Sequence, residues 1–249
     1  MGGARSVGPV HVRAETAAGA LNYLSQSITN RTGVRVAFAN THLLYHAIKD
    51  RELARALKDF LVLNDGVGMS LASHLACGAG FPENLNGTDF TPRLLAAAPS
   101  GTRVYLYGGR APVADRARVQ IAKSYPHLIL CGARHGYCEQ LADPAAIEDL
   151  TRLRPDLVLV ALGNPRQENF ITLLSHHLPE ATFVGVGALF DFIAGEAPRA
   201  PNWMRQAKLE WLFRLAREPT RLWRRYTIET LVVTASLLRS RFSVQRGAP

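Results

Sequence analysis

Six short apolar segments of the chain each end in glycine, asparagine or aspartate, and residues of these types can build a phosphate-binding crevice. Glycine lets backbone N–H groups approach a phosphate closely, and an aspartate can take a proton from a hydroxyl group. Asp65 follows an apolar run and precedes Gly66, so it could be such a base or could instead cap the helix that follows. The other segment ends are Asn40, Gly108-Gly109, Gly132, Gly163-Asn164 and Gly185-Val186-Gly187.

The segments that carry these residues are expected to be strands. They are apolar at consecutive positions, which is typical of strands covered on both faces in a parallel sheet. They are residues 34–38, 60–63, 104–107, 128–130, 157–162 and 183–186, and segments with helical spacing lie between them at 43–57, 67–75, 112–124 and 144–153. This alternation predicts an α/β, Rossmann-like, mostly parallel sheet flanked by helices. Turns between strands and helices need small or polar residues anyway, but six in series favour a nucleotide-type crevice at the carboxyl ends of the strands.

The pattern changes near the C-terminus. Residues 196–206 are rich in proline and arginine, and residues 207–242 are expected to be helical with a break at Pro219. Residues 199–249 hold eleven basic and three acidic side chains, a net of +8, whereas residues 1–198 have a net of +1. We therefore divide the chain into a catalytic domain, 1–198, and a basic amphipathic C-terminal appendage, 199–249, that suits an anionic partner. Arg221, Arg224 and Arg225 are expected to share one helix face, and an ordinary solvated helix docked on the sheet is the alternative.

Composition excludes several classes of protein. Hydrophobic residues make up 47% of the 249 residues, so the chain can bury a sizeable core. The three cysteines include no CxxC pair, which argues against a disulfide framework or a zinc site. No apolar run reaches the roughly 18–20 residues of a membrane-spanning helix, and no signal-peptide pattern is seen. We expect a cytoplasmic protein.

Motifs for other phosphate chemistry are absent from the sequence. Neither GxGxxG nor GxxxxGK[ST] occurs, and GxSxG and HExxH are missing too. The chain also lacks Asp-x-Asp, the carboxylate pair that commonly holds a divalent ion against a nucleotide diphosphate. We therefore expect no cofactor and no metal site, so that arginines and backbone amides would stabilise a leaving diphosphate.

Four blocks of sequence are more specific than these general patterns. They are NDGVGMSLASHL followed by PENLNGTDFTPRLL, VYLYGG with HGY downstream, PDLVLVALGNPRQENFI, and VGVGALFDFIAGEAPRAPNWMRQAKLEWLFRLAREPTRLWRRY. In this order the blocks resemble the WecG/TagA/CpsF family of bacterial glycosyltransferases over roughly residues 34–242. The resemblance implies an inverting transfer of a sugar from a UDP-sugar to an acceptor linked to a polyprenyl diphosphate at the cytoplasmic membrane face. It also implies a Rossmann-like fold with an appendage that helps the enzyme reach the membrane.

The resemblance assigns roles to three crevice residues. Asp65 matches the catalytic base, although a helix N-cap is the alternative role for an aspartate at this place. Asn40 matches a position that orients a sugar hydroxyl. Gln167 matches a position that contacts the donor sugar or its diphosphate, and its neighbour Glu168 can instead be a structural carboxylate. Gly108, Gly109, Gly163 and Asn164 complete the expected binding surface.

Five further residues match family positions around the donor. Tyr137 and Asp191 resemble residues beside the nucleotide base, with ordinary packing as the alternative. Arg214, Arg221 and Arg224 match arginines that close over the active site, since an arginine fork binds phosphate oxygens and stays charged. Attachment to anionic lipid is the alternative role for these arginines, and both roles are compatible.

Two positions depart from the family pattern. Many relatives have a threonine where this chain has Phe38, and many have an arginine where it has Asn84. We expect both positions to lie near the donor or acceptor. The loss of a cationic contact favours a neutral donor such as UDP-glucose in an exopolysaccharide pathway over UDP-N-acetylmannosamine or its uronic acid.

Two other readings of the sequence compete with the glycosyltransferase. A nucleotide- or RNA-binding protein could use a basic tail, but this tail has no recognised nucleic-acid module, so we expect no nucleic-acid partner. An inactive relative that serves as a scaffold is disfavoured, because Asp65 and Gln167 are present. The expected partners are the UDP-sugar, the lipid-linked acceptor and an anionic membrane surface, and a homo-oligomer is left open.

Overall fold

The structure, a computed structural model, describes residues 2–136 and 143–246. A six-stranded sheet forms its centre, with strand order β4-β3-β8-β7-β5-β6 and every neighbouring pair parallel. The strands are β3 Arg35–Ala39, β4 Phe60–Asn64, β5 Arg103–Gly108, β6 Ile129–Arg134, β7 Leu157–Ala161 and β8 Thr182–Gly185. The predicted α/β, Rossmann-like fold is confirmed, and all six expected strands are present.

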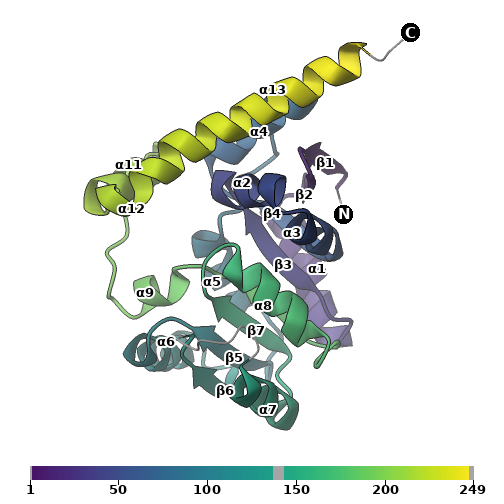
Figure 1. The fold of residues 1–249 in the computed structure, drawn as a ribbon. Coiled ribbons are helices and arrows are strands. Elements are labelled where there is room, and N and C mark those ends of the chain that lie inside the picture. The colour runs from purple at the N-terminus through teal and green to yellow at the C-terminus, as the bar shows by residue number, and fades with distance from the viewer. Residues whose placement is uncertain (1, 137–142, 247–249) are drawn as a thin grey trace.

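Helices cover both faces of the sheet, which is why its strands read as continuous apolar runs (Figure 1). One face packs against α1 Ala17–Asn30, α5 Gly87–Ala97, α6 Ala111–Ser124 and α9 Leu189–Ile193. The other face packs against α2 Thr41–Lys49, α3 Arg51–Ala56, α4 Val67–Cys77, α7 Pro144–Leu153 and α8 Arg166–Ser175. Every residue of β4, β7 and β8 is buried as a result.

Two local features differ from the sequence expectation. The helix expected over 43–57 is two helices, because Asp50 ends α2 and its side chain accepts hydrogen bonds from the N–H groups of Glu52 and Leu53 to begin α3. Near the N-terminus, β1 Ala4–Val7 and β2 Val10–Arg13 form an antiparallel hairpin that the analysis did not anticipate. Its valines, Val7, Val10 and Val12, join the core of the second face.

The C-terminal appendage is helical and breaks at Pro219, as predicted. It contains α10 Asn202–Gln206, α11 Glu210–Arg217, α12 Pro219–Arg224, a π-helical turn Arg225–Glu229 and α13 Thr230–Arg246. The long helix α13 lies across α2 and α4 (Figure 1). None of the helices in the described part of the chain is long and apolar enough to span a bilayer.

The appendage is packed into the body of the protein. Val233 and Leu237 of α13 are 2% and 1% exposed, and both belong to the core cluster that contains Leu43 and Leu44 of α2. The division at residue 198 therefore marks a change of composition, while α13 shares one hydrophobic core with the residues before it.

We predict that Leu237→Ala destabilises the protein, because it leaves a cavity between α13 and the body. Urea denaturation should show a loss of about 2–4 kcal/mol in the free energy of unfolding. The neighbouring Leu238 is 37% exposed, so Leu238→Ala is a matched control that should cost less than about 1 kcal/mol. Equal small effects of the two substitutions would show that α13 is not part of the core.

Candidate active site

A cavity of about 820 Å³ opens at the carboxyl edge of the sheet, between the strand ends and the appendage. The turns that follow β5, β7 and β8 contribute Gly109, Gly163 and Gly187 to its wall. Helices α11 and α12 close it from the other side, where Arg214, Arg217 and Arg221 line it. The structure thus brings strand-end glycines and appendage arginines together around one space.

The glycines of this edge have different roles. Gly163 and Gly187 have φ values of 73° and 56° and open space where a side chain would start, so their turns leave the backbone accessible from the cavity. The N–H of Gly109 donates to the carbonyl of Ala161 at 3.0 Å. Gly108 does not line the cavity. A Cβ at Gly108 would collide with the Ala161 backbone, so this glycine is needed for close packing of β5 against β7.

Asp65 directly follows β4, at the same edge of the sheet as the cavity, but neither Asp65 nor Asn40 is part of the cavity wall. The backbone N–H of Asp65 donates to the carbonyl of Ala39 at 2.7 Å, and Oδ2 accepts a 3.4 Å hydrogen bond from Nδ2 of Asn40. The N-cap of α4 is Gly66 at φ 86°, with no side-chain capping bond, so the carboxylate of Asp65 does not cap this helix. Asn40 itself caps α2, because its Oδ1 accepts from the N–H groups of His42 and Leu43.

Opposing effects set the protonation of Asp65. Its half-buried carboxylate loses hydration, and this burial raises the pKa of Asp65 above its usual value. The positive charges of Arg214 and Arg225 and the hydrogen bond from Asn40 lower the same pKa. Because Arg214 also lines the cavity, it connects the carboxylate of Asp65 electrostatically to the space where a ligand can bind.

Gln167 is only 2% exposed and is engaged within the protein. Its Oε1 accepts a 3.0 Å bond from the N–H of Gly187, and its Nε2 donates to Oε1 of Glu168 at 2.9 Å. Asn164 also donates to that Glu168 oxygen, at 2.6 Å. Gln167 and Asn164 therefore hold the turns around the cavity, and neither lies in its wall.

The remaining predicted residues are distributed around the appendage. Asp191 lines the cavity, and its pKa is raised by burial and lowered by the charge of Arg110. Tyr137 lies outside the described residues. Arg224 is exposed and is not part of the cavity wall, whereas the half-buried Arg225 approaches Asp65.

The three arginines that were expected to share one helix face therefore have different surroundings. Arg221 lines the cavity, Arg224 is exposed, and Arg225, the first residue of the π-helical turn, is half-buried. Sequence analysis assigned no role to the other basic residues of the cavity wall: Arg166 and Arg217, which lie within the quoted motifs, and Arg110, which directly follows one. A search for arginines directly after the strand-end glycines would have found Arg110.

The two positions that depart from the family pattern lie in different surroundings, and only Phe38 lies away from the place expected for it. Phe38 is 4% exposed and packs edge-to-face on Phe90, with ring centroids 5.8 Å apart, so it belongs to the core rather than the crevice. Asn84 lies next to the predicted base, because its Oδ1 accepts a 2.7 Å bond from the N–H of Gly66. Within the described residues, no group of three or more acidic, histidine or cysteine side chains is placed to hold a metal ion.

Comparison with known proteins agrees with this geometry. A family model described as "Glycosyl transferase WecG/TagA/CpsF family" matches residues 5–247. The chain is 33% identical over 208 residues to an N-acetylglucosaminyldiphosphoundecaprenol N-acetyl-beta-D-mannosaminyltransferase of Bacillus subtilis, which covers 82% of this chain and 80% of that protein. It is 32% identical over 226 residues to a protein of the same name from Bacillus spizizenii, with 90% and 84% covered. On these matches, the chain belongs to the WecG/TagA/CpsF family of glycosyl transferases.

Proposed function

We propose that the protein transfers a sugar, with inversion, from a UDP-sugar to an acceptor linked to a polyprenyl diphosphate. The observation that carries this proposal is the electrostatic interaction of the Asp65 carboxylate with Arg214, which lines a cavity formed by strand-end backbone and arginines. The names of the two Bacillus proteins support the class of acceptor, since both describe transfer onto a sugar diphosphoundecaprenol.

In this mechanism Asp65 is the general base. Its ionised carboxylate takes the proton of the acceptor hydroxyl while that oxygen attacks the anomeric carbon of the donor. The bond from the anomeric carbon to the diphosphate oxygen breaks, and its electron pair leaves with UDP. Asn40, which donates to Asp65 at 3.4 Å, orients the carboxylate and a sugar hydroxyl.

The cavity arginines stabilise the leaving diphosphate. Arg214, Arg217 and Arg221 line the wall formed by the appendage, and Arg110 and Arg166 line the wall formed by the sheet. Such cations offset the charge that develops on the leaving group without a dedicated metal ion. We propose that Asp191, in the same wall, accepts a hydrogen bond from the uracil base, and that Tyr137 stacks on that base.

Two donor sugars are candidates. N-acetylmannosamine is supported by the names of both relatives, and the burial of Phe38 removes one of the two reasons to expect a different donor. UDP-glucose, for an exopolysaccharide pathway, is favoured by the neutral Asn84 beside Gly66. We propose UDP-N-acetylmannosamine as the first donor to test.

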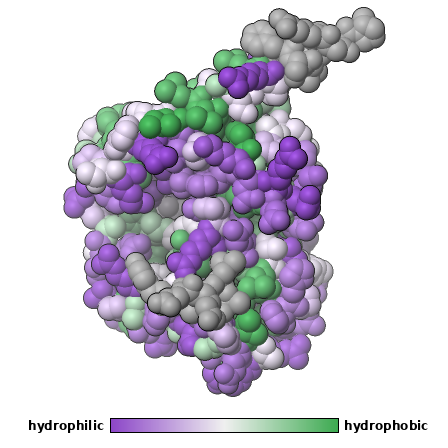
Figure 2. Space-filling model, viewed as in Figure 1, coloured by the Kyte–Doolittle hydropathy of each residue, from purple (hydrophilic) through white to green (hydrophobic). Residues whose placement is uncertain are grey.

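We further propose that the protein is peripheral on the cytoplasmic face of the membrane. Apolar residues gather along α13 above a mostly polar body (Figure 2). Exposed apolar side chains of the appendage include Trp211, Trp223, Ile228 and Leu231, interleaved with its basic residues. This combination suits the interface of an anionic bilayer.

Asp65→Asn should reduce sugar transfer by at least ~100-fold, the usual loss when a general base is removed. The fold and the affinity for UDP should be kept, since the amide has the same shape as the carboxylate. Asp59, an exposed aspartate at the other end of the same strand, provides the control variant Asp59→Asn, which should transfer at the normal rate. Transfer by folded Asp65→Asn within a few-fold of the unmodified protein would remove Asp65 from the mechanism.

Transfer should survive chelation, because arginines supply the positive charge around the diphosphate. The purified protein treated with excess EDTA should retain its rate within about twofold. Loss of activity that Mg²⁺ or Mn²⁺ restores would contradict metal-independent transfer.

The donor is tested by comparing UDP-N-acetylmannosamine with UDP-glucose on an N-acetylglucosaminyl diphosphate lipid. We expect N-acetylmannosamine to be transferred with the larger kcat/KM. A larger kcat/KM for UDP-glucose would instead show that the neutral side chain of Asn84 determines the donor.

A further inference from the structure

Glu168 is a fully buried carboxylate at the start of α8, with a relative exposure of 0%. Its Oε1 accepts two hydrogen bonds, from Nδ2 of Asn164 at 2.6 Å and from Nε2 of Gln167 at 2.9 Å. Its Oε2 is buried and has no hydrogen-bond partner among the described residues. The protein thus buries a carboxyl group with two neutral amides as its partners and one oxygen unsatisfied.

This arrangement is costly if its only purpose is packing. Burial raises the pKa of Glu168 to about 7, and the hydrogen bonds from the Gln167 and Asn164 amides act in the opposite direction. No ionised side chain in the described part of the protein contributes to this shift. A neutral glutamine of similar shape would avoid the cost of burying a charge. The presence of a glutamate at position 168 therefore needs an explanation other than packing.

The explanation lies in the orientation of the two amides. A carboxylate oxygen can only accept, so the NH₂ groups of Asn164 and Gln167 must both face Glu168. The carbonyl oxygen of Gln167 then faces the opposite way and accepts the N–H of Gly187 at 3.0 Å. The N–H of Gln167 also donates to the carbonyl of Gly163 at 2.9 Å.

These bonds join two turns of the cavity wall. Gly163 belongs to the turn after β7 and Gly187 to the turn after β8, and both line the 820 Å³ cavity. A glutamine at 168 could turn its own NH₂ group toward Gln167, and Gln167 would then present its NH₂ group to the N–H of Gly187. Two donors would face each other, and the turn after β8 would lose its anchor.

We propose that Glu168 is a positioning residue that fixes the orientation of the Gln167 amide and thereby holds the turns at Gly163 and Gly187 in the shape that binds the donor diphosphate. The role of this cavity rests on the proposed function. The hydrogen-bonded connection between the two turns does not depend on the proposed function, and it can be measured separately.

The first test is amide hydrogen exchange in the full-length protein. Glu168→Gln and Glu168→Ala should speed exchange of the Gly187 N–H by at least about tenfold, the change expected when a net hydrogen bond is lost. The Gly109 N–H, which donates to a backbone carbonyl, should be unchanged in both variants. Glu148→Gln, at an exposed glutamate of α7, is the matched control and should leave both amides unchanged.

The second test is binding of UDP alone, by calorimetry. Glu168→Gln should weaken UDP binding by about tenfold, with the KM of the acceptor unchanged, since one hydrogen-bond equivalent is about a factor of ten. Gln167→Met should weaken it similarly, and the double variant should be no weaker than either single variant, because the two residues act as one unit. Additive losses in the double variant would overturn the proposal.

The pH dependence of stability gives a readout that UDP does not affect. A carboxyl group whose pKa is raised on folding contributes stability below its unfolded pKa, near 4.5, that is lost as the pH rises through about 7. Glu168→Gln cannot ionise, so its Tm relative to the unmodified protein should rise by about 5 °C between pH 5.5 and pH 8.5. A constant difference in Tm would show that Glu168 is ionised in the folded protein over this whole range, as an exposed carboxylate is, and would contradict its burial between two neutral amides.

These outcomes separate the two proposals. If the unmodified protein does not bind UDP, the proposed function fails, while Gly187 exchange still decides the role of Glu168. If UDP binds but neither Gly187 exchange nor UDP affinity changes in the folded Glu168 variants, the positioning role is wrong and the proposed function stands.

Discussion

The parallel direction of all six strands is the constraint on which the rest of the structure depends. It brings the carboxyl ends of the strands to one edge, so that residues far apart in sequence, such as Asn40, Asp65 and Gly163, lie along the same rim. It also requires each strand to be followed by a turn into a helix, which is where glycines with positive φ leave the backbone exposed to the cavity. The chemistry therefore gathers at this edge because of the topology, before any single side chain is considered.

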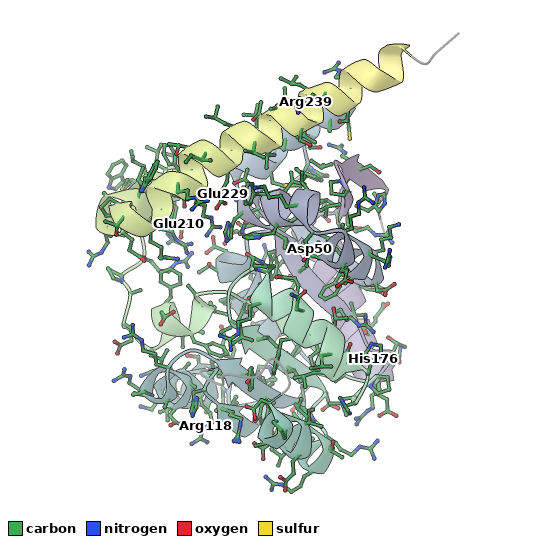
Figure 3. All side chains as sticks on the ribbon, viewed as in Figure 1. Asp50, Arg118, His176, Glu210, Glu229 and Arg239 are labelled. Atoms are coloured by element: carbon green, nitrogen blue, oxygen red, sulfur yellow. The ribbon has the colours of Figure 1, made fainter. Side chains whose placement is uncertain are left out.

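The carboxylate of Asp65 depends on the appendage for the positive charges around it. Burial opposes ionisation of Asp65, and the nearby positive charges come from Arg214 and Arg225, both of which belong to the appendage. The π-helical turn that carries Arg225 also contains Glu229, which is labelled in Figure 3. Oε2 of Glu229 lies 2.6 Å from Nδ1 of His42 in α2, and this contact holds the turn to the body. The contacts that hold the appendage to the body therefore have three consequences. They pack α13 in the core, place positive charge near Asp65 and close the cavity. A role of the appendage in membrane attachment alone would not require them.

The elements that sequence analysis predicted correctly are those with a strong local signal. Continuous apolar runs identified all six strands, and Pro219 identified the break in the appendage, because both depend on short-range rules. Residues whose role depends on tertiary contacts were less accessible. Phe38 is in the core because α5 passes over β3, and Arg225 acts on Asp65 because the appendage folds back over the end of β4. The N-terminal hairpin was missed because its strands, ARSV and VHVR, contain no continuous apolar run.

The two buried carboxylates of this edge show how environment separates roles. Both have a pKa raised by burial, but the groups that oppose this shift differ. Neutral amides hydrogen-bond to Glu168, whereas the charges of arginines act on Asp65. The amides fix an orientation, and the arginines oppose the rise in pKa that burial causes at Asp65. If the cavity takes a diphosphate, its negative charge will share Arg214 with Asp65 and weaken the attraction that lowers the pKa of Asp65. Donor binding would then raise the proton affinity of this carboxylate, so Asp65 becomes the stronger base only when the group to be transferred is in place.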